Sequence, residues 1–232
     1  DNSQANVSSK GNGSAGSVSI SASDVLLDNQ SQIVATTTES GTEGNITLDN
    51  LKTLELLKSE ITASTINAEA GDININTTDS VKLSNSSITS EASGDGIAGE
   101  LIITTNQFTI SDNSQANVSS KGNGSAGSVL INASDVLLNN QARIFGTTES
   151  GIGGNITLNG LTSLSLNNSE ISASTEDGVA GTLNINAADS IELTGKGGFS
   201  VQSTEGGIAG SVTVNTSQFN INDEARVTVS SR

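Results

Sequence analysis

The sequence has no cysteine, proline, methionine, tryptophan, tyrosine or histidine, and it has four phenylalanines in 232 residues. The absence of cysteine excludes a disulfide framework and a thiolate metal site. Without histidine or cysteine, the usual nucleophile and base triads cannot be assembled. Because aromatic and methionine side chains normally supply much of the bulk of a core, this core must be thin and made of valine, isoleucine and leucine.

Basic residues are also scarce, with 9 Lys and Arg against 25 Asp and Glu and a net charge of -16. This acidic balance argues against nucleic acid as a partner and against anionic membrane surfaces. No apolar run approaches the roughly 18 residues of a spanning helix, and no charged and then apolar leader opens the chain. We therefore expect a soluble chain that is not inserted in a membrane and whose export signal, if it has one, lies outside this sequence.

A short pattern recurs along the whole chain, in which a glycine is followed by alternating apolar residues. Its eight occurrences are GSVSI at 16, GNITL at 44, GDINI at 71, GELII at 99, GSVLI at 127, GNITL at 154, GTLNI at 181 and GSVTV at 210. The spacing is therefore 27 to 29 residues. A fixed period of this length is typical of stacked repeat architectures.

Each unit has two further alternating apolar pairs, such as Val25/Leu27 and then Ile33/Ala35. Alternation places these side chains on one face of a strand and their polar neighbours on the other. Each unit is thus predicted to form three short strands. In the fourth unit, the register of the third strand is uncertain around Ala116 and Val118.

Residues 51–61, LKTLELLKSEI, also fit one side of a helix. Their counterpart at 161–171, LTSLSLNNSEI, contains serine and asparagine, which discourage a helix. We therefore predict strand at both places.

A unit of three strands cannot bury its apolar face alone, so successive units must stack and pair strand on strand. The fold class predicted is all-β, a right-handed parallel β-helix (β-solenoid) of about eight coils with three sheets along its length; the right hand follows from the general preference of parallel crossovers. The glycine that starts each coil suits a corner, through positive φ or through close approach of backbones. One inward column would contain Val18, Ile46, Ile73, Leu101, Val129, Ile156, Leu183 and Val212.

Residues 1–232 therefore form a single repeat solenoid, with no second domain. Residues 1–18 reappear letter for letter at 112–129, which is a duplication of four coils. The chain starts in the middle of a coil, so we expect a segment of a longer array, with a subunit that stacks end to end as the alternative.

Candidate residues for chemistry are few. The neighbouring acids Glu176/Asp177 and Asp223/Glu224 could serve a polysaccharide lyase or hydrolase if a lysine or arginine converged on them, but solvated loop acids are the interpretation we favour. Calcium could use Glu91 with Asp95, or Glu176 with Asp177, yet no calcium-binding motif is present. We assign no catalytic, cofactor or metal residue. The cations that could meet acids near the third strand are Lys10, Lys121, Arg143, Arg226 and Arg232.

Threonines beside the third strand raise the possibility of ice binding, which would need the same outward threonines on successive coils. The threonines concerned are Thr36, Thr37, Thr38, Thr147 and Thr148. Other coils have Thr62, Ser64, Ser172 and Ser174 at the corresponding places. This mixture is ordinary for a solenoid surface, so ice binding is the least favoured function.

The segment GGNITLNGLTSLSLNNSEISASTEDGVAGTLNINA, from Gly153 to Ala187, resembles the repeats of large filamentous-haemagglutinin-like exoproteins, especially those of cyanobacteria. The resemblance extends over essentially the whole chain. It implies a right-handed β-helix, export by two-partner secretion through an outer-membrane pore, and a surface-exposed or released fibre that serves adhesion. The secretion domain of that family carries Asn-Pro motifs, whereas this sequence has no proline, so no secretion residue is assigned.

Together, these observations predict a secreted or cell-surface structural and adhesive fibre protein of bacterial origin, with no enzymatic activity. Its expected partners are the secretion pore, through a region not present here, further copies stacked end to end, and glycans of a cell surface or matrix. The alternative function is a carbohydrate-binding or polysaccharide-degrading enzyme on the same scaffold, recognised by a groove where acids and a cation from neighbouring coils converge.

Overall fold

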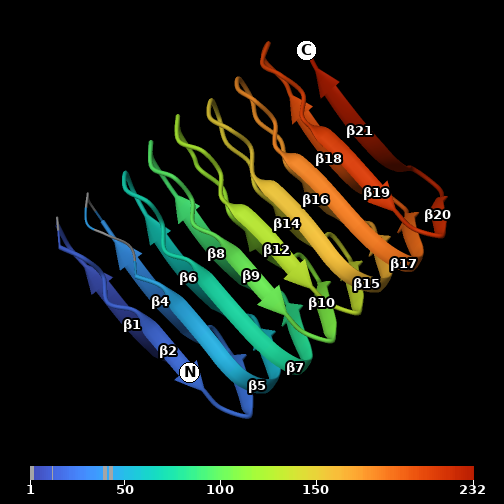
Figure 1. Cartoon of the computed structure of the whole chain (residues 1–232). Helices are drawn as coiled ribbons and strands as arrows, with labels where there is room; N and C mark the ends of the chain where they lie inside the picture. The colour runs from blue at the N-terminus through green and yellow to red at the C-terminus, as the bar shows by residue number, and fades with distance from the viewer. Residues whose placement is uncertain (1–2, 12, 39–40, 42–43) are drawn as a thin grey trace.

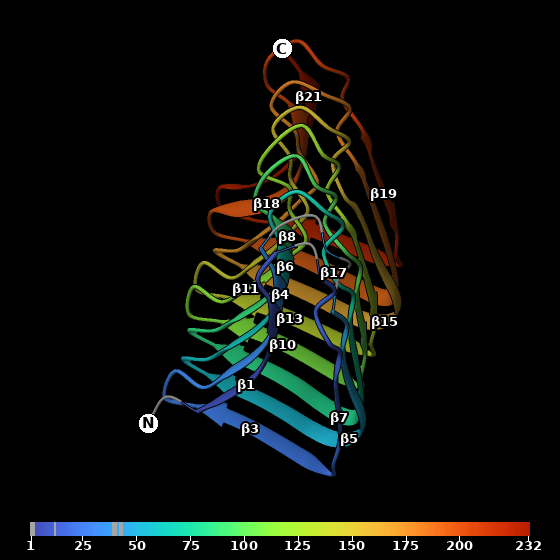
Figure 2. The ribbon, with the colours of Figure 1, turned by 90° about the vertical axis from the view of Figure 1, so that its left-hand side faces the viewer.

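The computed structural model describes residues 3–11, 13–38, 41 and 44–232. This part of the chain is all-β and contains no helix, so it has no helix long and apolar enough to cross a membrane. Its strands pair in parallel and form a β-solenoid of about eight turns, whose coils follow one another in chain order from the blue end to the red end (Figures 1 and 2).

One sheet has nine strands, one for each passage of the chain along this side of the solenoid. In spatial order they are β1 (Gln4–Ser9), β4 (Gln32–Thr37), β6 (Glu60–Thr65), β8 (Ser87–Ala92), β11 (Gln115–Asn117), β14 (Arg143–Phe145), β16 (Glu170–Ser172), β18 (Gly197–Ser203) and β21 (Ala225–Ser231).

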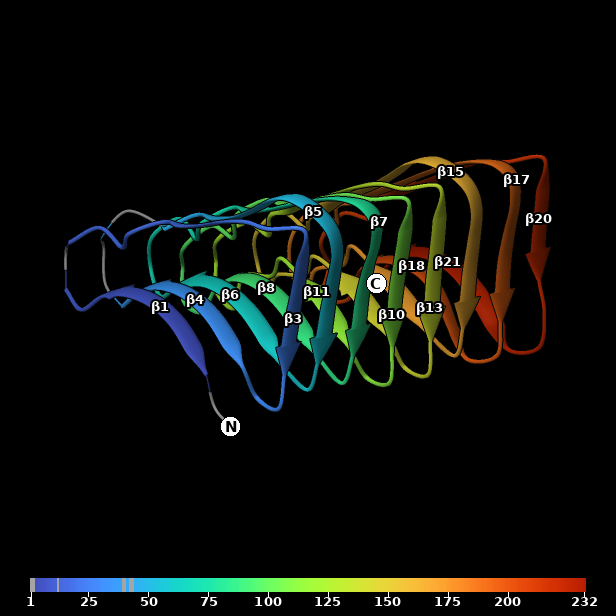
Figure 3. The same cartoon turned by 90° about the horizontal axis from the view of Figure 1, so that it is seen from below.

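The other sheet has twelve strands and contains the first and second strands of every coil. They are β2 (Val18–Ser21), β3 (Asp24–Asp28), β5 (Ile46–Leu57), β7 (Ile73–Ser84), β9 (Leu101–Thr104), β10 (Gln107–Ser111), β12 (Ser128–Asn132), β13 (Asp135–Asn139), β15 (Asn155–Asn167), β17 (Thr182–Thr194), β19 (Ser211–Asn215) and β20 (Gln218–Ile221). Figure 3 shows the row that begins with β1, β4, β6 and β8 apart from the row that begins with β3, β5 and β7.

The prediction of three separate sheets is wrong. In β5, β7, β15 and β17 the first and second strands of a coil are one continuous strand, which bends where the register shifts beside Leu51 and Leu161. Backbone pairing continues around this bend because no proline interrupts it and because Asn50 and Gly160, both with positive φ, turn the chain there.

The stacking of aliphatic residues from coil to coil is confirmed. Val18 pairs with Ile46, and the pairing continues through every predicted member of that column to Val212. Ile46, Ile73 and Leu101 are fully buried. Each coil therefore covers the apolar face of the coil before it, which is how a chain with so few large side chains acquires a core.

The two uncertain segments are now assigned. Residues 51–57 continue β5 and the chain enters β6 at Glu60, so strand is correct and the helix is excluded. In the fourth coil, Ala116 pairs with Ile88 on one side and Ile144 on the other, and both Ala116 and Val118 are buried.

The corner glycines are needed for close approach and not for positive φ. None of the eight that start a coil has positive φ. A Cβ on Gly127 would lie 1.9 Å from the carbonyl oxygen of Gly99, and one on Gly181 would lie 1.9 Å from that of Gly154. The glycines therefore stack on each other's carbonyl groups, which no larger residue permits.

Positive φ occurs instead at the turn from the twelve-stranded to the nine-stranded sheet. Asn29, Asn85, Asn140 and Asn168 occupy this turn on different coils, with φ between 49° and 54°. Asparagine tolerates the left-handed region better than other residues with a side chain. This turn brings each coil sharply onto the nine-stranded sheet, whose outer face carries the candidate site.

Candidate functional site

The outer face of the nine-stranded sheet presents columns of polar side chains that run along the solenoid. Inward residues such as Ala116, Val118 and Ile144 belong to the core, so their neighbours point outward. The first column, in register order, is Gln4, Gln32, Glu60, Ser87, Gln115, Arg143, Glu170, Gly198 and Arg226. Side chains of one column are neighbours across coils and can form ladders of hydrogen bonds.

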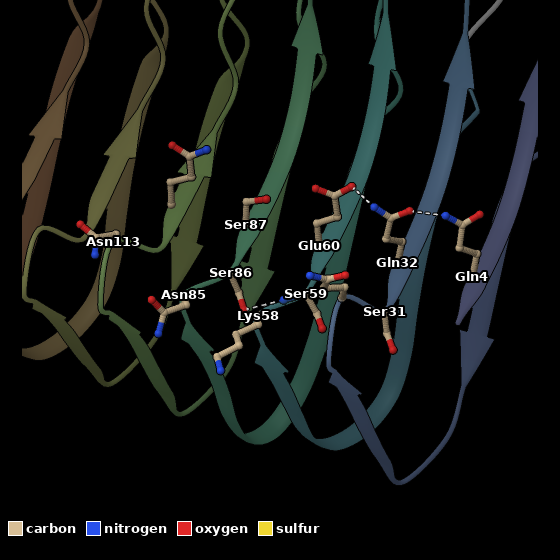
Figure 4. Close-up of a pocket in the computed structure, with 12 residues that line it drawn as sticks. Gln4, Ser31, Gln32, Lys58, Ser59, Glu60, Asn85, Ser86, Ser87 and Asn113 are labelled. Carbon is tan, nitrogen blue, oxygen red and sulfur yellow. Dashed lines mark hydrogen bonds between the residues drawn. The ribbon is translucent and has the colours of Figure 1, made fainter. Parts of the chain in front are cut away.

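The beginning of the first column is such a ladder. Gln4 donates its side-chain N–H to Gln32, and Gln32 donates to the carboxylate of Glu60 (Figure 4). At Ser87 the long side chains stop, and a hollow of about 450 Å³ opens beside the turns that carry Lys58 and Asn85. The hollow is lined by polar side chains and is open to solvent, so it offers hydrogen bonds but little apolar surface.

A second hollow, of about 580 Å³, lies further along the same face. We call it the trough. Its floor is a column of short hydroxyl side chains, Ser119, Thr147 and Ser174, with Ser119 and Thr147 hydroxyls 3.1 Å apart. Longer side chains stand on both sides: Asn117 and Phe145 on one, and Lys121, Glu149 and Glu176 on the other.

At one end of the trough an acid and a cation from neighbouring coils meet. Lys121 Nζ lies 2.8 Å from Glu91 Oε1. The other carboxylate oxygen of Glu91 accepts a hydrogen bond of 3.2 Å from Asn117 Nδ2. Asn117 is 4% exposed, and its Oδ1 atom is buried without a hydrogen-bond partner in the described part of the chain. The amide is thus held by its nitrogen while its oxygen is unsatisfied.

Phe145 is half-buried at the side of the trough, and the Arg143 guanidinium lies 4.8 Å from the centre of its ring. Arg143 also pairs with Glu170 at 3.5 Å. Phe145 and Glu170, which lie on adjacent coils, therefore hold the Arg143 guanidinium over the aromatic ring. At the equivalent outward place, the preceding and following coils have Asn117 and Ser172.

The predicted acidic residues are distributed over separate surroundings. Asp95 accepts hydrogen bonds from the backbone and side chain of Asn123, both at 3.0 Å, while Glu91 belongs to the trough. Asp223 occupies a turn with positive φ, and Glu224 lies 4.0 Å from Lys196. In the described ranges, no three acidic residues lie close enough together to hold a metal ion.

Of the five cations singled out in the sequence, Lys121 and Arg143 meet acids. For Lys10, Arg226 and Arg232, the structure records no ion pair within the part of the chain that it describes. Glu176 belongs to the trough with Glu149 of the preceding coil. One cation and one acid from neighbouring coils, the kind of contact expected of an enzyme on this scaffold, meet in the trough at Lys121 and Glu91.

The threonines do not form a flat outward ladder. Thr37 and Thr148 are buried, so they face inward. Thr36 pairs with Ser64, and Ser64 pairs with Glu91. The column therefore changes from hydroxyl to carboxylate within three coils, and a regular array of threonine methyl and hydroxyl groups is absent from these positions.

A carboxylate bridges three coils at the turn that precedes β11. Asp112 accepts hydrogen bonds from Asn140 Nδ2 at 3.1 Å, Ser111 Oγ at 2.9 Å and Ser84 Oγ at 3.0 Å. These donors favour the charged form and hold the pKa of Asp112 below its usual value. The side chain of Thr53, and then that of Ser23, lower the pKa of Asp24 in the same way.

Sequence reasoning missed Asn117 and Phe145, although one signal was present. Phe145 is an aromatic residue at an outward position in a chain with four phenylalanines, whereas Phe108 and Phe199 are buried. The orphaned oxygen of Asn117 had no signal, because it depends on how Glu91 and Lys121 close around the amide.

Searches of protein-family models, of characterised protein sequences and of solved structures found no match to this chain.

Proposed function

We propose that this chain is a structural and adhesive fibre protein, secreted or held at the outer surface of a bacterial cell. The observation that carries the proposal is the uninterrupted parallel register of the nine-stranded sheet from β1 to β21. Each coil contacts its neighbours, so a shaft of this kind is lengthened by whole coils without a new core. A role in spanning distance and presenting a surface uses this property directly.

Adhesion is supported by the repetition of polar columns on the outer face. Ladders such as Gln4, Gln32 and Glu60 present hydrogen-bonding side chains at the regular spacing of the coils. Weak contacts repeated along one rigid body add through effective concentration, so strong attachment does not require one deep pocket. The acidic net charge of -16 favours surfaces that are neutral or positively charged.

The partners that we propose follow from the family resemblance of the repeats. Export would use an outer-membrane pore, contacted by a region other than these 232 residues. Filaments would form either from one long polypeptide or by end-to-end association of copies, and glycans of a cell surface or matrix would be the ligands.

A second candidate is an enzyme that cleaves polysaccharides, and the ion pair of Lys121 with Glu91 in the trough is the observation that favours it. We propose binding without catalysis. Incubating the chain with soluble glycans and measuring new reducing ends decides between the two, since an enzyme produces them and an adhesive shaft does not.

The test of the fibre proposal is immunogold electron microscopy of the cells that make the chain, with an antibody raised against it. Labelled fibres on the cell surface or in the medium are expected. Label confined to the cell interior would overturn the proposal. Beads coated with the chain should also attach to producing cells or their matrix more than beads coated with an unrelated acidic protein.

A further inference from the structure

The trough contains a polar atom that the protein leaves unsatisfied. Asn117 Oδ1 is buried and has no hydrogen-bond partner among the residues that the structure describes, and the residue points outward from β11 at the side of the trough, between the inward residues Ala116 and Val118. A buried acceptor without a donor is costly and rare in folded proteins. The amide cannot rotate to give its oxygen a donor, because its N–H already donates a hydrogen bond to Glu91. A ligand hydroxyl or amino group would supply the missing donor.

Other groups in the trough also lack donors. Glu149 and Glu176 lie on successive coils along one side, are exposed, and form no ion pair in the described residues. Carboxylates accept hydrogen bonds and do not donate them. The trough therefore calls for a ligand with many O–H or N–H donors, and its uncompensated negative charge disfavours a ligand that carries acid groups.

The walls and floor suit a ring with one apolar face and several hydroxyls. Phe145 supplies apolar surface at one side. The hydroxyls of Ser119 and Thr147 share one hydrogen bond on the floor, and their remaining capacity to donate or accept is available to a ligand. Aromatic surface next to convergent polar groups is the usual composition of a small-molecule site.

The shape of the trough favours a linear ligand that lies along the solenoid. Its floor residues come from successive coils, and its lining extends from Glu91 at one end to Thr204, four coils further on, at the other. Four steps of the coil spacing amount to about 19 Å, which is long enough for several sugar units. A peptide fits less well, since its carbonyl groups need donors and the carboxylates of Glu91, Glu149 and Glu176 in the trough supply none.

We infer that the trough binds a linear oligosaccharide that is neutral or carries amino groups, and that it rejects uronic acid and sulfated glycans. The inference rests on the proposed adhesive function, since it names the ligand class that this part of the shaft holds. In the bound state the exposed Lys121 side chain swings out of the trough, Glu91 keeps its hydrogen bond to Asn117 Nδ2, and a ligand hydroxyl or amino group donates to Asn117 Oδ1 while a sugar ring lies on Phe145.

The test is calorimetric titration of the full chain with three hexasaccharides: one of glucose, one of glucosamine and one of galacturonic acid. We expect binding of the first two and none of the third. Phe145→Thr, which installs the residue found at the equivalent Thr89, should weaken binding at least about tenfold, or about 1.4 kcal/mol. The matched control is Val34→Thr, an outward apolar residue in the same column but outside the trough, which should leave binding unchanged.

Two further variants separate the polar contributions. Asn117→Leu should remove binding of both ligands, and circular dichroism reports whether the variant folds; should it not fold, the Phe145→Thr and Val34→Thr pair still decides. Glu149→Gln with Glu176→Gln should abolish the preference for glucosamine over glucose.

Binding of the galacturonic acid hexamer, binding of a basic peptide in place of both sugars, or equal binding by Phe145→Thr and Val34→Thr would overturn the inference. If coated beads still attach to surfaces while no sugar binds, the trough inference fails and the adhesive function stands.

Discussion

Substituting alanine for one corner glycine adds a single Cβ atom between two coils and so tests how closely the coils stack. Residues 1–18 and 112–129 are identical, so Gly16 and Gly127 have the same local sequence. A Cβ on Gly127 would lie 1.9 Å from the carbonyl oxygen of Gly99 on the preceding coil, whereas a Cβ on Gly16 would lie 3.7 Å from its nearest neighbour, Val7 Cβ. The two substitutions therefore differ in the contact that the new Cβ makes with another part of the chain, and not in local conformational propensity.

The magnitude follows from the distance. A carbon and an oxygen in ordinary contact lie about 3.3 Å apart, so Gly127→Ala must move the two coils apart by more than about 1 Å. Nearby hydrogen bonds between the two coils, including Ser120 Oγ–H to Gly96 O at 2.8 Å and Ala98 N–H to Ser125 O at 3.1 Å, would then be strained or broken. Overpacking costs about 1–3 kcal/mol and each lost hydrogen bond about 1 kcal/mol, which gives about 3–5 kcal/mol in total.

Urea denaturation followed by circular dichroism measures the free energy of unfolding of both variants. Gly127→Ala should lose about 3–5 kcal/mol and Gly16→Ala less than about 0.5 kcal/mol. Hydrogen exchange should show the loss of protection at the coils on either side of Gly127. Equal stability of the two variants would refute the reasoning, because the local sequence would then determine the effect.

Three further predictions concern the core, the Asp112 carboxylate that bridges three coils, and the turns. Phe108→Ala should cost about 3–5 kcal/mol and Phe219→Ala less than half of that, because Phe108 is fully buried while Phe219, at the equivalent place, is 40% exposed; thermal denaturation measures both. Folding lowers the pKa of Asp112 below its ordinary value of 3.8, so its contribution to stability is present above that value and is lost as the pH falls through the lowered pKa. Asp112→Asn should remove this component, and the Tm of the variant should depend less on pH than that of the wild type between about pH 5 and about pH 2; an unchanged pH dependence would contradict the role of the carboxylate. Asn85 has a φ of 49°, so Asn85→Ala should cost about 1 kcal/mol and Asn85→Gly almost nothing in the same denaturation assay; equal losses would show that φ is not the cause.

The solenoid could be predicted because its information is local and repeated. Alternation in a unit such as Val18 to Ile20 identifies a strand, and the recurrence of the unit fixes which residues stack. The bend at Leu51 and Leu161 could not be predicted, since the continuity of a strand around a corner depends on pairing with the neighbouring coil. The same holds for the corner glycines, whose reason lies in the distance to a carbonyl group of another coil.

The candidate site was less accessible to sequence reasoning than the fold. The sequence indicates Lys121 as a cation near the third strand and Glu91 as a possible calcium ligand with Asp95, but the contact of 2.8 Å between Lys121 and Glu91 arises from side-chain positions on neighbouring coils. Phe145 and Asn117 can be recognised as trough residues only when the outward columns of successive coils are aligned. The trough forms where short side chains follow one another along a column between columns of longer side chains. A hollow of this kind is a property of the register and not of any single repeat.

Disulfide trapping tests the register of adjacent coils most directly, and the natural chain has no cysteine that could interfere. Thr47 and Asn74 are partners across β5 and β7, so their Cα atoms lie about 4.8 Å apart, within the range that a disulfide accepts. Thr47→Cys with Asn74→Cys should oxidise to an intramolecular disulfide that mass spectrometry detects, whereas Thr47→Cys with Asn76→Cys, two residues out of register, should remain reduced. Preferential bridging of the second pair, or no bridging of the first, would contradict the stacking of coils on which this account depends.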